Sequence, residues 1–241
     1  MPNTHGLTRN IPADVARAVR ARCGFGCARC AATIYEYEHF LPDFKDAKEH
    51  DSDKIVLLCP SCHGLVTKGL IPKEQVAEFS AKPKSREIGF SSQNLPIFRG
   101  VPTMKFGENG VLLHNVRVPI VVGGQPRLFF APPEDGGSAT RINLDFSNAA
   151  GKPLLKVTHN EWQVFVGEWD FEMIGSRYVF SDSQRASLLS IRFNAPHFLT
   201  VERMHAYMGG KLFDIDDNGM CVDGIRMRHM VGSNCYSLLS I

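Results

Sequence analysis

Residues 53–63 read DKIVLLCPSCH, and two features of this stretch organise the N-terminal part of the chain. The four apolar residues at 55–58 predict a short buried strand. The CPSC pair follows at once, and 28 residues separate it from a matching CARC pair earlier in the chain. Each CxxC loop places two thiolates on one side of an ion, which suits tetrahedral zinc. The predicted ligands of a structural zinc ion are Cys27, Cys30, Cys59 and Cys62.

The chain has seven cysteines, an odd number. Its N-terminus lacks the basic and apolar segments of a secretory signal, and no apolar run reaches roughly 18 residues, so we expect a cytoplasmic protein without a membrane span. In that setting, cysteines are metal ligands or free thiols more often than disulfides. Buried free thiols are the alternative to zinc ligands, but they do not explain why four cysteines occur in two pairs with the same spacing. Cys23 is interpreted as a spare thiol, because the CxxC cysteines have the better spacing.

The segments around the cysteines predict a small unit of helices and strands. Residues 11–22 have helical periodicity. Residues 34–40 alternate and are rich in aromatic side chains, which predicts a strand, and the polar residues 43–53 predict a loop. Two helices are expected after the second cysteine pair, over 60–68 and 72–79.

The combination of Glu38-His39, Pro42 three residues on, the apolar strand and a CPSCH sequence ending at His63 resembles the HNH (ββα-metal) nuclease family. The resemblance covers residues 9–70. It implies an endonuclease that hydrolyses phosphodiester bonds in DNA to leave 5′-phosphate and 3′-hydroxyl ends, with double-stranded DNA as the expected partner. It also implies that His39 is the general base and that Glu38 and His63 bind a catalytic Mg²⁺, Mn²⁺ or Ni²⁺ ion.

The residue types fit this chemistry. Hydrolysis of a phosphodiester needs a base for the proton of water, a cation for the developing charge, and a rigid frame that holds both in line. A histidine can be the base near neutral pH, and a carboxylate with a second histidine can hold a divalent ion. Thr67 and Lys68 follow His63 by about one helical turn, where they are expected beside the metal or a phosphate.

Each candidate also has a purely structural interpretation. His39 can be an ordinary strand histidine, His63 an additional zinc ligand, and Glu38 the partner of an arginine. His50, in the polar loop, is expected to be solvated. An open cleft shared by His39 and His63 would favour the enzyme hypothesis, whereas a His63 turned onto the zinc would exclude it.

One position departs from the family pattern. Lys54 stands where HNH nucleases usually have asparagine, nine residues before His63. A charged lysine offers only hydrogen-bond donors, so it cannot bind Mg²⁺, although it can contact the scissile phosphate. Lys54 is therefore kept among the candidate catalytic residues. The alternatives are an inactive zinc module that binds nucleic acid or a protein, and a zinc scaffold whose second domain carries the activity.

The composition changes after the second predicted helix. Prolines, serines and scattered charges over residues 81–104 predict a linker. It would connect an HNH nuclease domain at 1–80 to a separate domain at 105–241. The whole chain is thus expected to be of the α+β class.

Residues 105–241 predict an all-β domain. Short apolar segments recur about every 8–14 residues, and turn pairs such as Gly123-Gly124 separate many of them. A sandwich is the first expectation, with a barrel or a short solenoid as alternatives. Trp162 and Trp169 are expected to be core residues.

The net charge is only +2, from 27 basic and 25 acidic side chains. This balance is weak for a nucleic-acid binder, so a phosphate-binding surface must be local or must be built by oligomerisation. The β domain is accordingly expected to form a homo-oligomer, sense a signal or bind a regulatory partner. A nuclease joined to a regulatory domain resembles the layout of bacterial or phage defence effectors.

Overall fold

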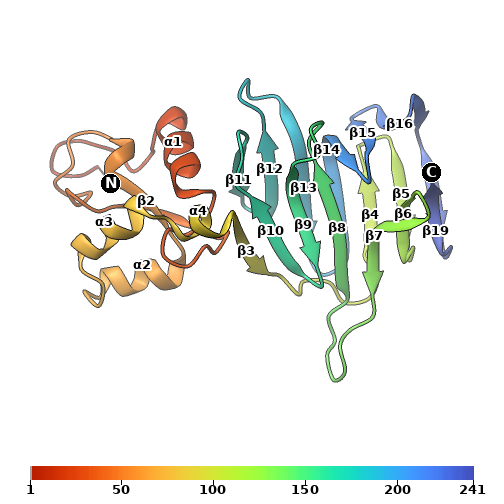
Figure 1. Cartoon of the computed structure of the whole chain (residues 1–241), viewed down its shortest axis with the longest axis horizontal. Coiled ribbons are helices and arrows are strands. Elements are labelled where there is room, and N and C mark those ends of the chain that lie inside the picture. The colour runs from red at the N-terminus through yellow and green to blue at the C-terminus, as the bar shows by residue number, and fades with distance from the viewer. Residues whose placement is uncertain (1) are drawn as a thin grey trace. The chain divides into compact units, whose positions relative to one another are not determined.

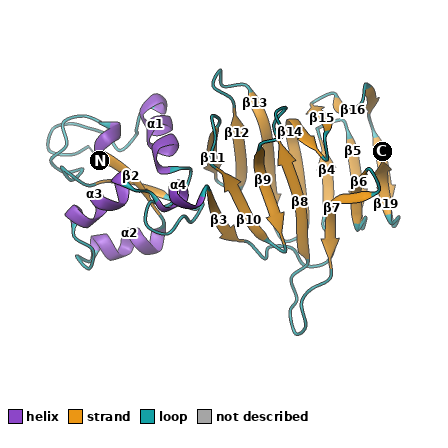
Figure 2. Cartoon of the chain, in the orientation of Figure 1, coloured by secondary structure: helices purple, strands orange, loops and turns teal. Residues whose placement is uncertain are grey.

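The computed structural model describes residues 2–241 as a mixed α+β chain in which strands predominate (Figure 1). Its contacts divide the chain into two compact units. The first unit is the chain up to Gln93 together with Val164–Asp170, and the second is Asn94–Gln163 with Phe171–Ile241. The helices belong to the first unit and most strands to the second (Figure 2). Within the described residues, every helix is too short or too polar to cross a bilayer.

The first unit contains the helices and strands predicted around the cysteines, each within two residues of its expected bounds. The segment expected as a linker carries a further short helix and strand. The elements are α1 (Ala13–Cys23), β1 (Glu36–His39), η1 (Ser52–Lys54), β2 (Ile55–Leu58), α2 (Pro60–Thr67), α3 (Lys73–Ala81), α4 (Lys84–Ile88) and β3 (Phe90–Asn94).

The strands β1 and β2 form an antiparallel pair that leads into α2. Glu36 lies opposite Leu58, and His39 lies opposite Ile55. All four residues of β2 are buried, which explains why the strand is continuously apolar rather than alternating. Cys59 caps α2, because its Sγ accepts a hydrogen bond from Cys62 N at 3.4 Å. The chain therefore passes from a buried strand into a helix with one cysteine at the junction.

A buried ion pair fixes α1. Arg20 is only 5% exposed. Its Nε donates to Asp170 Oδ1 at 2.9 Å and its Nη2 to Asp170 Oδ2 at 2.5 Å. Removing one partner of a buried pair typically costs about 3–5 kcal/mol, because the other charge is left uncompensated. Asp170 is thus a structural part of this unit although it lies 150 residues after Arg20.

The second unit is all-β, as predicted. Its strands are β4 to β19, except for the residues of β10 and β11 that belong to the first unit. They are β4 (Thr103–Phe106), β5 (Val111–His114), β6 (Val118–Val122), β7 (Gln125–Ala131), β8 (Arg141–Ser147), β9 (Pro153–Thr158), β10 (Glu161–Phe165), β11 (Asp170–Ile174), β12 (Arg177–Ser181), β13 (Ser187–Asn194), β14 (Phe198–Met208), β15 (Lys211–Asp216), β16 (Gly219–Val222), β17 (Ile225–Met227), β18 (Met230–Ser233) and β19 (Ser237–Ser240).

The pairing of these strands differs from the expected sandwich of two separate sheets. Sequential strands pair antiparallel from β6 to β9 and from β12 to β17. Three parallel pairs, β4–β14, β5–β18 and β6–β19, join strands that are far apart in sequence. The strand β14 has four partners, since it also pairs with β8 at Tyr207. The strands therefore form one connected, closed sheet.

Aromatic side chains fill the core of the second unit. Trp162 is fully buried, and its ring meets Phe193 edge-on with the centroids 4.9 Å apart. Tyr178 contacts Trp162 in the same manner at 5.6 Å. Trp169 is also buried, although it belongs to the first unit, where its Nε1 donates to Phe165 O at 3.0 Å. Both tryptophans are thus core residues, as predicted.

Candidate functional site

Four cysteine sulfurs converge in the first unit. Cys27 and Cys30 lie in the segment between α1 and β1, and Cys59 and Cys62 lie at the start of α2. All four sulfurs lie within 4.8 Å of one another, with Cys30 Sγ 3.7 Å from Cys59 Sγ and 3.9 Å from Cys62 Sγ. A tetrahedral zinc ion with bonds of about 2.3 Å to sulfur would hold its ligands roughly 3.8 Å apart. The cysteine cluster therefore fits a metal ion such as zinc.

Local bonding favours the thiolate at Cys30 alone among the clustered cysteines whose pKa is shifted, since the hydrogen bond to Cys30 raises the pKa of Cys27 and burial raises that of Cys59. The pKa of the Cys30 thiol is lowered to about 5, chiefly because Cys27 donates a hydrogen bond to it. Arg29 Nη1 donates to Cys62 Sγ at 3.6 Å. Cys23 lies outside the cluster, and burial raises the pKa of its thiol, which suits a spare cysteine. A divalent cation bound by four thiolates would neutralise part of the charge that the sulfurs bring together.

A pocket of about 850 Å³ in the first unit is lined by Glu38, His39 and His63. We call it the histidine pocket. Its residues meet because α2 directly follows β2, the strand that pairs with β1. Thr67 lines the pocket as well, and its hydroxyl donates to His63 O at 3.1 Å. None of the clustered cysteines is among the lining residues, so His63 opens onto a space that is separate from the sulfurs.

His63 is held between two glutamates of β1. Its Nε2 lies 2.8 Å from Glu38 Oε2, and its Nδ1 lies 2.6 Å from Glu36 Oε2. Alternate residues of a strand point to the same face, so Glu36 and Glu38 reach the histidine together. Glu36 was not among the sequence candidates, although its spacing of two from Glu38 was the signal that could have revealed it.

Lys73 brings a positive charge into the histidine pocket from the start of α3. Its Nζ bonds to Glu38 Oε1, lies 2.8 Å from Asp43 Oδ1 and donates to His39 O at 2.8 Å. Burial by itself lowers the pKa of Lys73, but the bonds to Asp43 and Glu38 outweigh it and leave the pKa raised. Lys73 therefore stays charged and neutralises part of the carboxylate charge. Sequence reasoning missed it, because nothing local marks a lysine 35 residues after Glu38.

His39 lies at the end of β1 and is only 8% exposed. Burial lowers its pKa, and the nearby His50 and Lys73 lower it further against the opposing effect of Glu38. At neutral pH the ring is therefore uncharged, which is the form that can accept a proton.

The expectation that His50 is solvated is wrong. The side chain is half-buried, and both of its ring nitrogens have partners. Its Nδ1 lies 3.1 Å from His39 Nε2, and its Nε2 lies 3.0 Å from Thr8 O. The loop that looked merely polar in sequence folds back onto the pocket, and no spacing rule could have shown this.

Lys54 is placed differently from the other candidates. It is the last residue of η1, it is exposed, and it is not a lining residue of the histidine pocket. Its main chain makes the local connections, since Phe40 N donates to Lys54 O at 3.1 Å and Lys54 N donates to Asp51 O at 3.0 Å. The loop is thus braced through backbone atoms at position 54. Lys68 is also exposed and does not line the pocket.

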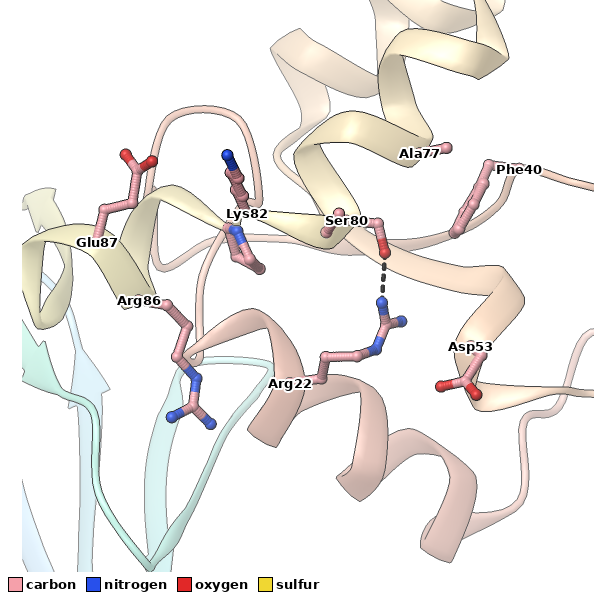
Figure 3. Close-up of a pocket in the computed structure, with 10 residues that line it drawn as sticks. Arg22, Phe40, Asp53, Ala77, Ser80, Lys82, Arg86 and Glu87 are labelled. Atoms are coloured by element: carbon pink, nitrogen blue, oxygen red, sulfur yellow. Dashed lines mark hydrogen bonds between the residues drawn. The ribbon is translucent and has the colours of Figure 1, made fainter.

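A second pocket of about 850 Å³ in the first unit surrounds Arg22 (Figure 3). Figure 3 shows the guanidinium of Arg22 directed at the hydroxyl of Ser80, to which it donates a hydrogen bond. Arg22 also donates to Ser52 O at 2.7 Å and to Ile55 O. These bonds tie α1 to η1, β2 and α3, and the lining holds no histidine or cysteine. We therefore assign this pocket a structural role.

Comparison with known proteins gives no match: no family model, no curated protein and no solved structure aligns significantly with this chain. The function is therefore inferred from the residues and their geometry.

Proposed function

We propose that the first unit is an HNH-type endonuclease, a metal-dependent hydrolase of phosphodiester bonds in DNA. The observation that carries the proposal is the histidine pocket, whose lining includes the uncharged His39 together with Glu38 and His63. The same β1–β2–α2 element carries half of the cysteine cluster. A module that only binds zinc needs the cysteines, but it gains nothing from a carboxylate and two histidines around an open pocket.

Glu38 and His63 have a spacing that suits the ligands of one divalent ion. Glu38 Oε2 and His63 Nε2 lie 2.8 Å apart in a hydrogen bond, which a divalent ion bound by both atoms would replace. Neighbouring ligands on an octahedral ion with bonds of about 2.1 Å are separated by roughly 3 Å. Two protein ligands leave positions for water and for a phosphate oxygen, as is usual for Mg²⁺. When bound, an Mg²⁺, Mn²⁺ or Ni²⁺ ion would stabilise the negative charge that develops on the phosphate and the leaving oxygen.

His39 is the proposed general base. As the oxygen of a water molecule bonds to phosphorus, His39 accepts a proton from that water. The bond from phosphorus to the 3′-oxygen then breaks, the 3′-oxygen takes a proton from solvent, and the ends are a 5′-phosphate and a 3′-hydroxyl. Arg9, Lys45 and Lys73 also line the pocket. Arg9 and Lys45 would supply local positive charge for the DNA backbone on a chain whose net charge is only +2, whereas Lys73 is bonded to Glu38 and Asp43.

We propose double-stranded DNA as the substrate of this nuclease and the cytoplasm as its location. The all-β unit would be a regulatory, recognition or oligomerisation domain, as in a bacterial or phage defence effector. The support is the division of the chain into a unit that holds the histidine pocket and a unit that is entirely β.

Plasmid cleavage tests the proposal. The full-length protein should nick or cut supercoiled plasmid with Mg²⁺, Mn²⁺ or Ni²⁺ and should be inactive in EDTA. His39→Ala should lower the rate by about 10²–10⁴-fold at unchanged zinc content, because general-base catalysis is worth about that much. His205→Ala is the matched control, since His205 is exposed on β14. Absence of cleavage with every metal, or equal cleavage by His39→Ala, would contradict the proposal.

An inactive zinc module that binds nucleic acid or a protein is the second candidate. The observation that favours it is Lys73, whose ammonium already neutralises the carboxylate of Glu38, a proposed metal ligand. This candidate predicts zinc-dependent binding of DNA or of a protein, with equal affinity in wild type and His39→Ala. Binding measured by fluorescence anisotropy beside the cleavage assay separates the two candidates.

A further inference from the structure

His50 connects the histidine pocket to the N-terminal segment of the chain. It lies in the loop between β1 and η1. On one side its Nδ1 faces His39 Nε2 at 3.1 Å, and on the other its Nε2 faces Thr8 O at 3.0 Å. Three groups from separate segments therefore form one continuous chain of hydrogen bonds.

The carbonyl group at the end of this chain fixes the positions of the hydrogens. A carbonyl oxygen only accepts, so His50 Nε2 must carry the hydrogen of that bond. An uncharged His50 then has a bare Nδ1, which accepts a hydrogen bond from His39 Nε2. His39 consequently carries its own hydrogen on Nε2 and keeps a lone pair on Nδ1. None of the hydrogen bonds within the described chain involves His39 Nδ1.

We infer that His50 is the positioning residue of His39, because it selects the tautomer whose Nδ1 is free to accept a proton from water. The catalytic meaning of this inference rests on the proposed nuclease function, whereas the tautomer itself does not. In this role His50 never touches the substrate. It sets which nitrogen of His39 is the base and which direction that nitrogen faces.

Aromatic packing holds the two rings in this arrangement. Phe44 stacks on His50 with centroids 6.5 Å apart and meets His39 edge-on at 5.3 Å. Arg9 lies over the Phe44 ring, 4.6 Å from its centroid. Asn3 Nδ2 donates to Phe44 O at 2.6 Å and so ties the N-terminal segment to the same loop. The segment before α1 is therefore part of the pocket and orders its histidines.

Nitrogen-15 NMR of the histidine rings tests the inference in the intact, zinc-loaded protein, because protonated and bare ring nitrogens have well-separated shifts. His39 should carry its hydrogen on Nε2 in the wild type. His50→Asn keeps an acceptor oxygen near the position of Nδ1 and should preserve that tautomer, whereas His50→Leu should give a mixture of both. A wild-type His39 protonated on Nδ1, or an unchanged tautomer in His50→Leu, would overturn the inference.

Cleavage rates separate this inference from the function on which it rests. With His50→Leu we expect kcat to fall roughly tenfold or more, as for other groups that orient a catalytic histidine, with little change in KM. His50→Asn should recover part of the loss. His5→Leu, which replaces an exposed histidine of the N-terminal segment, should match the wild type.

Each outcome bears on one of the two claims. Equal cleavage by wild type and His50→Leu would refute the positioning role and leave the nuclease proposal intact. The expected tautomers without cleavage by the wild type would support the geometry and refute the nuclease proposal. Loss of zinc or of helical circular dichroism would identify a misfolded His50→Leu protein. In that case, the tautomers of His39 in the wild type and in His50→Asn decide whether the inference holds.

Discussion

The cysteine cluster and the histidine pocket lie in the same small unit, but they differ in how their charged groups are balanced. The cluster gathers four thiol groups within 4.8 Å, with Arg29 bonded to one of them. In the histidine pocket, by contrast, the carboxylate of Glu38 is paired with the ammonium of Lys73 and also lies 2.8 Å from His63 Nε2. The first arrangement calls for a cation to hold it together, whereas the second is already balanced by the protein. We therefore expect the zinc ion of the cysteine cluster to stay bound. A divalent ion in the histidine pocket is expected to bind only when it displaces the ammonium of Lys73 from Glu38.

The largest expected effect comes from breaking the cysteine cluster. Cys62→Ser should release zinc and unfold the first unit, because zinc binding contributes on the order of 10 kcal/mol to small modules of this kind. Zinc content measured with a chromogenic chelator and thermal unfolding followed by circular dichroism would show both changes. Cys235→Ser, which alters a cysteine outside the cluster, is the control and should keep its zinc. Wild-type zinc content and melting in Cys62→Ser would refute the structural role of the cluster.

A smaller effect is expected at the histidine pocket. Lys73→Met removes the ammonium that neutralises Glu38 and Asp43, so the carboxylates should attract a divalent ion more strongly. We expect Mn²⁺ to bind about tenfold more tightly, a gain of about 1.4 kcal/mol, in an electron paramagnetic resonance titration. Lys68→Met removes a nearby exposed charge that does not line the pocket and should change the affinity little. Unchanged or weaker binding in Lys73→Met would show that the ammonium does not compete with a metal.

The smallest effect is expected at the position that departs from the HNH pattern. Lys54→Asn should change the cleavage rate by less than about twofold and the free energy of unfolding by no more than about 0.5 kcal/mol, as is usual for exposed sites. The reason is that the bond from Phe40 N uses the main-chain oxygen of Lys54, which the substitution keeps. Cleavage assays and urea titrations of the two proteins measure both quantities. A large gain in cleavage would instead show that the lysine side chain impairs the site.

The features of this chain that could be predicted are those carried by neighbours in sequence. The CxxC spacing predicted the cysteine cluster, because each short CxxC loop places its two thiols close together. The apolar run at 55–58 and the alternation before it predicted the strand pair. Since α2 follows β2 without a gap, Glu38 and His63 had to approach each other once the strands paired.

The features that could not be predicted depend on contacts between distant segments. Lys73 lines the histidine pocket from a helix, and His50 contacts His39 from a loop, although both segments have ordinary polar sequences. The same limit applies to the sheet of the second unit. Apolar spacing predicted that the region is all-β, but it merged β5 with β6 into one segment and missed β12. The parallel pairing of β4 with β14 depends on a partner about a hundred residues away, which no local pattern encodes.

The pair of Arg20 and Asp170 means that the histidine-pocket unit, although compact in space, is not a contiguous stretch of the gene. During synthesis, the strands before residue 164 are translated before Asp170, the last residue of this unit. The ion pair between Arg20 and Asp170 therefore cannot form until most of the chain has been synthesised. A fragment ended at residue 80, before the expected linker, or at Gln93 would carry every candidate catalytic residue but would lack the carboxylate of Asp170 that pairs with Arg20. The shortest coding sequence that includes the whole unit therefore extends to codon 170.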